Sequence, residues 1–168
     1  DVKVFRRTLG PYLPQDRSAR IFEIGCGSGS FLNYLTGESY TQATGMDQDL
    51  SHVKAAAQLG IAGASCGDAM AHLAKSPEAF DCIVAIDVVE HLTKDEIFGM
   101  LDIVKAALKP GGTFLWRSPN ADGPFAGRLR YGDLTHEISF TRSSAWQLMG
   151  VAGFEDVVIV GEASVVTG

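Results

Sequence analysis

The chain has 168 residues, of which 46% are apolar and 20% are charged. This composition excludes a disordered or fibrous protein, because enough apolar side chains are present to form a hydrophobic core. The formal net charge of −6 argues against charge-driven binding to nucleic acid or to anionic membranes.

Short apolar strands alternate with helical patterns along the chain. The first strand is expected at residues 20–24, and the helix after it has an apolar side over 31–35 and ends near Gly37. Further strands are expected at 43–46, 61–66, 80–86, 113–116 and 157–160. Further helices are expected at 50–59, 70–74, 93–108 and 143–152.

This alternation predicts an α/β fold of the doubly wound, Rossmann-like type, with a mostly parallel sheet of six to seven strands and helices on both faces. The run 80–86 is almost continuously apolar, which is typical of a central parallel strand. Thr93 and Glu96 form a capping-box pattern at the start of the next helix. We expect Trp116 and Trp146 in the core. The long polar segment 118–140 breaks the alternation and is expected to be a loop, of a length that suits a lid or binding segment.

The cysteines and the lack of membrane-spanning or signal-peptide patterns indicate the class of protein and its compartment. Cys26, Cys66 and Cys82 form no C-x-x-C pair, which favours neither a disulfide scaffold nor a zinc cluster and suits a reducing cytoplasm. No apolar stretch is long enough to span a membrane, and no signal-peptide pattern is found. We expect one domain over residues 1–168. Because Asp1 rather than Met is first, we expect a trimmed or partly ordered piece.

Three glycines alternate where the first strand turns into the first helix. With the acid before them, Glu23, Gly25, Gly27 and Gly29 form the pattern E-x-G-x-G-x-G. Such glycines let a ligand lie against bare backbone, beside the free N–H groups of a helix N-terminus. The fingerprint of a nicotinamide dehydrogenase would need glycine at position 30, where this chain has Ser30.

This pattern resembles the class I S-adenosylmethionine-dependent methyltransferases, and the resemblance covers nearly the whole chain. It implies S-adenosylmethionine as cofactor, with Asp47 accepting hydrogen bonds from the ribose hydroxyls and Asp68 near the adenine amino group. Cys26 is expected to fit beside the cofactor and not to act as a nucleophile. The residues that the resemblance assigns to the cofactor are Glu23, Gly25, Cys26, Gly27, Gly29, Asp47, Gln48, Asp68, Ala69 and Asp87.

The candidate catalytic groups follow the strand at 80–86. Asp87, Glu90 and His91 share one side of a turn, and the segment 118–140 adds His136. The spacing resembles the E-x-x-E-H element of ubiquinone-biosynthesis O-methyltransferases and small-RNA 2′-O-methyltransferases, where it holds a divalent metal. By that resemblance Asp87, Glu90, His91 and His136 would bind Mg, Mn or Zn, with Asp in place of the first Glu. The metal-free alternative has His91 or His136 as general base, with Asp87 in the same catalytic group.

Several acceptors fit these residues. The segment 118–141 also resembles methyltransferases of polysaccharide and small-metabolite pathways, so the first hypothesis is O-methylation of a small-molecule or glycan hydroxyl. Acidity disfavours an RNA acceptor, which stays an alternative beside a non-catalytic cofactor-binding sensor or structural subunit. Arginines around the segment would either contact an anionic acceptor or form a solvated face: Arg117, Arg128, Arg130 and Arg142. The family closes its sheet with a seventh, antiparallel strand, of which residues 163–168 would be only a beginning.

Overall fold

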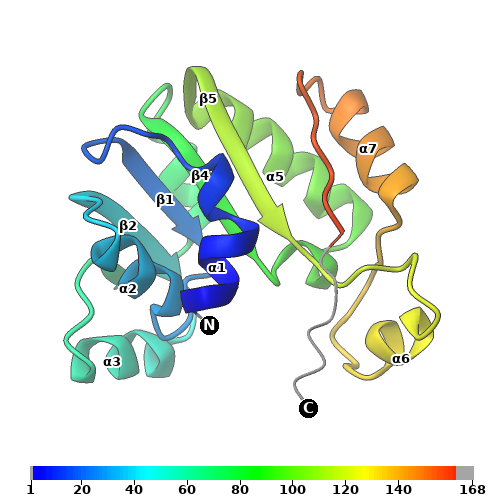
Figure 1. The fold of residues 1–168 in the computed structure, drawn as a ribbon, viewed down its shortest axis with the longest axis horizontal. Helices are drawn as coiled ribbons and strands as arrows, with labels where there is room; N and C mark the ends of the chain where they lie inside the picture. The colour runs from blue at the N-terminus through cyan, green and yellow to red at the C-terminus, as the bar shows by residue number, and fades with distance from the viewer. Residues whose placement is uncertain (1, 162–168) are drawn as a thin grey trace.

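A computed structural model describes residues 2–161 of the chain. Its five strands form one parallel sheet in the order β3-β2-β1-β4-β5 (Figure 1). The strands are β1 (Arg20–Ile24), β2 (Gln42–Asp47), β3 (Ala64–Cys66), β4 (Phe80–Ile86) and β5 (Leu108–Arg117). The strand order reverses between β1 and β4, and ligands of open α/β sheets bind beyond the carboxyl ends of the strands at such a point.

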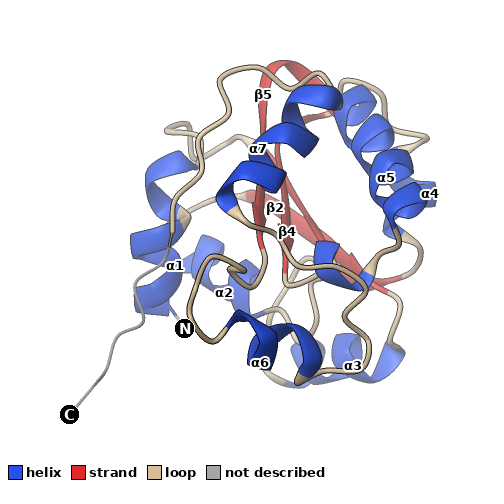
Figure 2. Cartoon of the chain, turned by 90° about the vertical axis from the view of Figure 1, so that its right-hand side faces the viewer, coloured by secondary structure: helices blue, strands red, loops and turns tan. Residues whose placement is uncertain are grey.

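Helices cover both faces of this sheet. They are α1 (Val2–Thr8), α2 (Ser30–Gly37), α3 (Leu50–Gln58), α4 (Ala69–Leu73), α5 (Lys94–Ala107), α6 (Ala126–Tyr131) and α7 (Arg142–Val151), with short 3-10 turns η1 (Gly10–Tyr12) and η2 (Val89–His91). Figure 2 shows the sheet edge-on, with α1 and α2 on one side and α4 and α5 on the other. The expected fold class is confirmed, although residues 2–161 form five strands rather than the expected six to seven.

The central strand β4 separates two hydrophobic clusters. Its side chains point alternately to the two faces of the sheet, as the period of two in a strand requires. Ile83 and Ala85 pack in one cluster with α4, α5 and α7, whereas Cys82 and Val84 pack in the other with α1 and α2. All four are fully buried, which explains why this strand is continuously apolar.

The helix α5 begins as the sequence predicts. The Thr93 hydroxyl accepts a hydrogen bond from Glu96 N, and the Glu96 carboxylate accepts one from Thr93 N at 2.8 Å, so the capping box is complete. One face of the helix then buries Ile97, Leu101 and Val104 against the sheet. Position and packing of α5 therefore follow from local signals.

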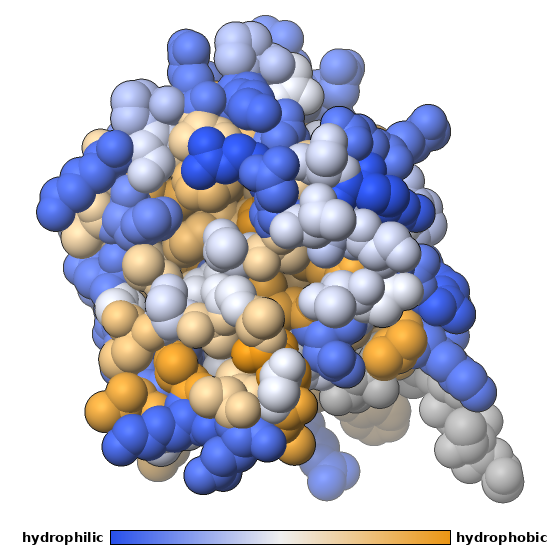
Figure 3. Space-filling model, turned by 90° about the vertical axis from the view of Figure 1, so that its left-hand side faces the viewer, coloured by the Kyte–Doolittle hydropathy of each residue, from blue (hydrophilic) through white to orange (hydrophobic). Residues whose placement is uncertain are grey.

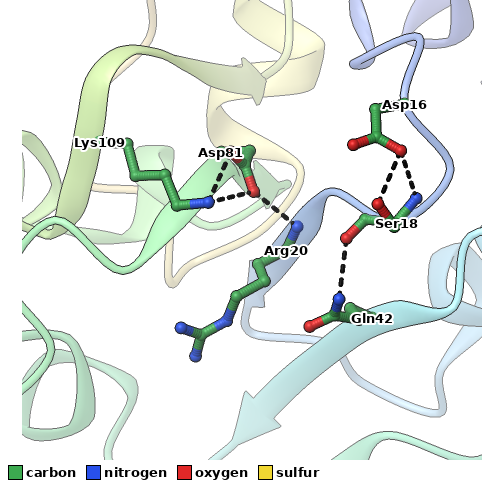
Figure 4. A network of polar contacts seen from close by, with 6 residues as sticks. All are labelled: Asp16, Ser18, Arg20, Gln42, Asp81 and Lys109. Carbon is green, nitrogen blue, oxygen red and sulfur yellow. Dashed lines mark hydrogen bonds and ion pairs between the residues drawn. The ribbon is translucent and has the colours of Figure 1, made fainter.

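A polar network ties the amino ends of the strands together (Figure 4). The Asp81 carboxylate accepts hydrogen bonds from Arg20 N at 2.8 Å and from Lys109 Nζ at 2.8 and 2.9 Å, which joins β4 to β1 and β5. On the other side of β1, Gln42 Nε2 donates to Ser18 O at 3.0 Å. This network therefore lies at the edge of the sheet opposite to the carboxyl ends of the strands.

The free edge at β3 is short. This strand has three residues, and Ser65 and Cys66 are exposed. Figure 3 views the molecule from the side on which β2 and α3 lie in Figure 1, and hydrophilic residues lie mainly along the top and right of this face, whereas neutral and apolar ones extend from its centre to the lower left. A short edge strand offers little backbone for pairing with another chain.

Three expectations about the fold are wrong. Residues 157–160 form no strand, because within residues 2–161 no other strand pairs with them. The segment 118–140 is not all loop, since it contains α6. Trp146 is 62% exposed, because α7 turns Ala145 and Met149 to the core instead.

Smaller differences concern element bounds and one aromatic residue. β3 begins at Ala64 rather than at residue 61, and β5 already begins at Leu108. Trp116 is half-buried and packs edge-on against Phe140, with 4.8 Å between ring centroids. Residues 163–168, where a seventh strand was expected to begin, lie outside the described residues. Within residues 2–161, no helix is both long and apolar enough to cross a bilayer.

We expect Asp81→Asn to lower the free energy of unfolding by about 1 kcal/mol at neutral pH, because the half-exposed ion pair with Lys109 is lost. Burial alone would raise the pKa of Asp81, but the hydrogen bonds from Lys109 and from the Arg20 N–H outweigh it and lower the pKa. A carboxyl with a lowered pKa stabilises the fold above its unfolded pKa, and this effect is lost as the pH falls through the folded pKa.

Urea denaturation at about pH 7 and about pH 3 measures this difference. The gap between wild type and Asp81→Asn should close at the lower pH, and an equal gap at both would contradict the assignment. Asp102→Asn is the matched control, because Asp102 is exposed on α5 and its replacement should change stability by less than about 0.5 kcal/mol.

Candidate active site

The glycine turn after β1 has left-handed backbone at each alternate glycine. Gly25, Gly27 and Gly29 have φ of 67°, 52° and 80°. A Cβ at Gly25 would lie 2.7 Å from Val88 Cγ2, and one at Gly29 would lie 2.8 Å from Ile61 Cγ2. A Cβ at Gly27 would meet no atom within 4 Å. The outer two glycines thus allow close packing, and the middle one leaves open space against the backbone.

Asp47 at the end of β2 holds this turn in place. Its carboxylate accepts hydrogen bonds from Gly27 N and from Asp49 N, each at 2.8 Å. His52 Nδ1 lies 3.5 Å from the same carboxylate. Asp47 is not fully buried, since 15% of its side chain is exposed.

A cavity of about 280 Å³ lies over the glycine turn. Glu23 lines it with only 3% of its surface exposed, and its Oε2 atom has no hydrogen-bond partner. Burial raises the pKa of Glu23 well above its usual value, and the Asp47 charge raises it further. Burial also raises the pKa of the Cys26 thiol to about 12, which disfavours the thiolate form that acts as a nucleophile. The walls come from Val4, Phe5, Glu23, Gly25, Cys26, Gly27, Ser28, Ser30, Phe31, Ile86 and Arg117.

Asp87 and Arg117 form an ion pair at the edge of this cavity. Arg117 Nε lies 3.2 Å from Asp87 Oδ1, and its Nη2 also bonds the carboxylate. Asp87 N donates to Arg117 O at 2.9 Å, where β4 and β5 end side by side. Asp87 therefore turns toward β5, and it is absent from the cluster of Glu90, His91 and His136. The four-residue metal set expected from the sequence is not assembled.

The other three members of that set do come together. Glu90, His91 and His136 each offer one possible ligand atom, and these atoms lie within 4.8 Å of one another. The two imidazole rings have centroids 4.8 Å apart. Glu90 is 1% exposed, its Oε2 has no partner, and burial raises the pKa of its carboxyl. Glu90 O accepts hydrogen bonds from Glu137 N and Ile138 N at 2.8 and 3.2 Å, which docks the segment 118–140 on η2.

Hydrogen bonds fix the tautomers of both histidines. His136 Nδ1 lies 3.0 Å from Leu129 O, and a carbonyl can only accept, so Nδ1 carries the proton. His91 Nδ1 lies 2.9 Å from the Thr135 hydroxyl, which itself donates to Asp133 Oδ1 at 2.6 Å, so this Nδ1 also donates. In the neutral state both Nε2 atoms are left with a lone pair, ready to accept a proton or to bind a metal.

The remaining residues that were expected to bind the cofactor differ in their exposure and contacts. Asp68 is exposed and caps α4, accepting from Met70 N and Ala71 N at 2.8 and 3.1 Å. Ala69 is buried as the first residue of α4, and Gln48 is exposed after β2. Both follow the carboxyl ends of their strands, on the same edge as Asp47.

Two of the arginines serve structural contacts. Arg130 donates to Glu137 O at 2.7 Å, and Arg142 donates to Ile159 O at 2.6 Å. Arg128 is exposed on α6.

The sequence analysis did not predict that α1 contributes Val4 and Phe5 to the wall of the cavity. A signal for this helix was present, because Phe5 and Leu9 are both buried and have the spacing of residues on one face of a helix.

A family model described as a methyltransferase domain matches residues 3–158. The chain belongs to this methyltransferase family. Among solved structures, an S-adenosylmethionine-dependent methyltransferase from Archaeoglobus fulgidus is 25% identical, with a TM-score of 0.78 over 93% of this chain and 70% of that one. One from Mesorhizobium loti is 18% identical, with a TM-score of 0.70 over 91% and 82% of the two chains. A possible histamine N-methyltransferase from Thermotoga maritima is 20% identical, with a TM-score of 0.73 over 92% and 72%. No curated protein matches the sequence.

The family implies S-adenosylmethionine as cofactor. The residues at the glycine turn of this methyltransferase fit such a ligand. Open space over Gly27 leaves room beside the backbone, Asp47 offers acceptor oxygens for hydroxyl groups, and Glu23 supplies a buried carboxyl with an unpartnered oxygen. The ligand carries a positive sulfonium and ribose hydroxyls, which are complementary to these groups.

We expect Glu23→Gln to stabilise the protein at neutral pH relative to wild type. Because folding raises the pKa of Glu23, its favourable contribution is complete below the unfolded pKa and is lost as the pH rises toward the folded pKa. The wild type should therefore lose up to about 1.4 kcal/mol per pH unit in this range, and the variant should not.

Urea denaturation at about pH 5 and about pH 8 tests the expectation, since the gap between the two proteins should widen with pH. A gap that stays constant would show that Glu23 titrates normally. Glu155→Gln is the control, because Glu155 is exposed and its replacement should produce no such pH-dependent gap.

Proposed function

We propose that this methyltransferase binds S-adenosylmethionine over its glycine turn and methylates a hydroxyl group of a small-molecule or glycan acceptor. The observation that carries the proposal is the pair of His91 and His136, whose Nε2 atoms are both free to accept a proton. The turn that holds His91 borders the cofactor cavity, because Val88 packs against Gly25 and Asp87 pairs with the wall residue Arg117.

The cofactor-binding residues are proposed from their position along the carboxyl edge of the sheet. Asp47 would accept hydrogen bonds from the ribose hydroxyls, and the backbone at Gly25 and Gly27 would face the ligand. Asp68, with Gln48 and Ala69, would border the adenine. When bound, S-adenosylmethionine supplies a methyl group on a positively charged sulfur, which is open to in-line displacement.

A hydroxyl acceptor needs a base, because an alcohol is a poor nucleophile until its proton is removed. In the proposed mechanism Nε2 of His91 or His136 takes that proton. In His136 the Nδ1–H group keeps its hydrogen bond to Leu129 O. In His91 the Nδ1–H group keeps its hydrogen bond to the Thr135 hydroxyl, which donates in turn to Asp133. A carboxylate or carbonyl behind the ring holds its orientation and stabilises the imidazolium that forms.

A divalent metal is the second version of this mechanism. Two imidazole nitrogens and one carboxylate from Glu90, His91 and His136 suit Mn or Zn better than Mg, which prefers oxygen ligands. Asp87 would join them only by leaving Arg117. The net charge of −6 favours a small or neutral acceptor over RNA.

Replacing Asp47 with Ala should weaken binding of S-adenosylmethionine by about 1–3 kcal/mol, because the acceptor oxygens for the ribose hydroxyls are lost. Isothermal titration calorimetry measures the change, and Asp102→Asn should bind like wild type. Unchanged affinity in the Asp47 variant would remove Asp47 from the cofactor site.

Replacing His91 or His136 with Ala should lower the rate of methyl transfer by about 10²-fold or more, with cofactor affinity unchanged. The assay follows a labelled methyl group into a panel of hydroxylated sugars and small vicinal diols. Cofactor binding without turnover in the wild type, on every acceptor, would favour the non-catalytic sensor.

A chelator separates the two versions of the mechanism. If the histidines act as bases alone, treatment with EDTA should leave the rate unchanged. A metal would make the rate fall on chelation and return on addition of Mn or Zn, and Glu90→Gln should then raise the metal concentration needed for recovery.

A further inference from the structure

The helix α6 and the turn after it expose several large apolar side chains. The exposed fractions are 75% for Phe125, 50% for Leu129, 78% for Tyr131 and 99% for Leu134. Figure 1 shows α6 at the lower right, apart from the sheet. We refer to these side chains and the two arginines among them as the α6 surface, which consists of Phe125, Arg128, Leu129, Arg130, Tyr131 and Leu134.

A helix as short as α6 is not stable in water by itself. It has six residues, whereas isolated helices shorter than about 12–15 residues are marginal even in favourable sequences. Helices in proteins are stabilised mainly by packing of an apolar side, and α6 has no buried residue within the described part of the chain. Its exposed apolar side chains therefore indicate a partner that residues 2–161 do not supply.

The α6 surface projects from the molecule and does not line a cavity. Small ligands bind in concave sites, and the cavity over the glycine turn has no lining residue from 125–134. The same holds for a second cavity of about 250 Å³ between α5 and α7. Projecting Phe, Leu and Tyr side chains suit a partner into which they can insert, such as the interfacial region of a lipid bilayer.

The two arginines of α6 favour a lipid of negative charge. Arg128 is exposed, and because it follows Phe125 by three residues, both lie on the same side of the helix. Arg130 donates to Glu137 O at 2.7 Å, and its guanidinium lies 5.3 Å from the centre of the Tyr131 ring. Residues 123–132 contain both arginines and no acid. This stretch is thus locally basic, which fits anionic headgroups.

The acids that flank the α6 surface limit how much charge can contribute. Asp122 accepts a hydrogen bond from Arg142 N at 2.7 Å, and Asp133 accepts one from Thr135 N at 2.8 Å. Glu137 is exposed, and the whole chain has a net charge of −6. Binding driven by charge alone is therefore disfavoured. Apolar insertion has to be the larger contribution, and the arginines, which share the helix with the inserted side chains, add to it.

We propose that the α6 surface binds the surface of membranes that contain anionic phospholipid. The apolar side chains enter the interfacial region, and Arg128 and Arg130 lie at the headgroups. The contact is peripheral, since no helix within residues 2–161 is both long and apolar enough to cross a bilayer. It does not depend on the proposed function, because it requires neither cofactor nor turnover.

Sedimentation of the 168-residue chain with sucrose-loaded vesicles tests this binding. We expect the chain to bind vesicles with about one third phosphatidylglycerol roughly tenfold more tightly than vesicles of phosphatidylcholine alone. In about 1 M salt the Debye length falls to about 3 Å, so this preference should disappear. The weaker binding by apolar insertion should remain, because salt does not screen it.

Leu134→Ser and Phe125→Ser should each weaken vesicle binding about tenfold or more, because a large inserted side chain is lost. Leu59→Ser is the matched control and should bind like wild type, since Leu59 is 71% exposed at the end of α3, outside the α6 surface. Arg128→Gln should lower the preference for phosphatidylglycerol about fivefold, whereas Arg128→Lys should keep it. Circular dichroism checks that each variant is folded.

Three results would overturn the proposal. The first is no binding to either vesicle, or equal binding by wild type, Leu134→Ser and Phe125→Ser. The second is binding that is indifferent to phosphatidylglycerol. The third is a dimer in sedimentation velocity without vesicles that Leu134→Ser dissociates, which would assign the α6 surface to a second copy of the chain. None of these results bears on cofactor binding at the glycine turn, so the proposed function is tested separately.

Discussion

The close approach of the glycine turn to the end of β2 is the constraint on which the site depends. A Cβ at Gly45 would lie 2.8 Å from Cys26 Cβ and 3.0 Å from Glu23 O, so β2 can pass beneath the turn only with glycine at this position. The passage brings Met46 O within hydrogen-bond distance of the turn and sets Asp47 against its backbone. Without that approach the glycine turn would lose the hydrogen bonds that hold it against the end of β2.

Two carboxyl side chains in this part of the molecule are buried, and the packing of the fold does not explain why either position is acidic. Glu23 and Glu90 are almost fully buried with an unpartnered oxygen each, in a chain whose other buried side chains are apolar within the described residues. An apolar residue at either place would cost less free energy. Groups that lower stability in this way concentrate at functional sites. Glu23 faces the cavity over the glycine turn, whereas Glu90 lies beside the two histidines, so each falls in a different half of the candidate site.

Local signals in the sequence predicted the parts of the molecule that local contacts determine. The capping box at Thr93, the central strand and the glycine turn all depend on neighbouring residues, and all are found. The diversion of Asp87 to Arg117 depends on the pairing of β4 with β5, which brings residues 30 apart in sequence together. Residues 157–160 have the composition of a strand, but a strand also needs a neighbour, and composition does not supply one. Periodicity likewise did not show which face of α7 carries Trp146.

The histidine pair shows how a distant segment completes the site. His91 belongs to η2, directly after the central strand, whereas His136 arrives on a segment held to η2 through Glu90 O. The same segment supplies Leu129 O and Thr135, which set the tautomers of the two rings. The two imidazole rings are therefore oriented only when this segment is docked. In the proposed mechanism, docking of this segment and orientation of the base are therefore one event, so that an acceptor that stabilised the docked segment would also orient the group that removes its proton.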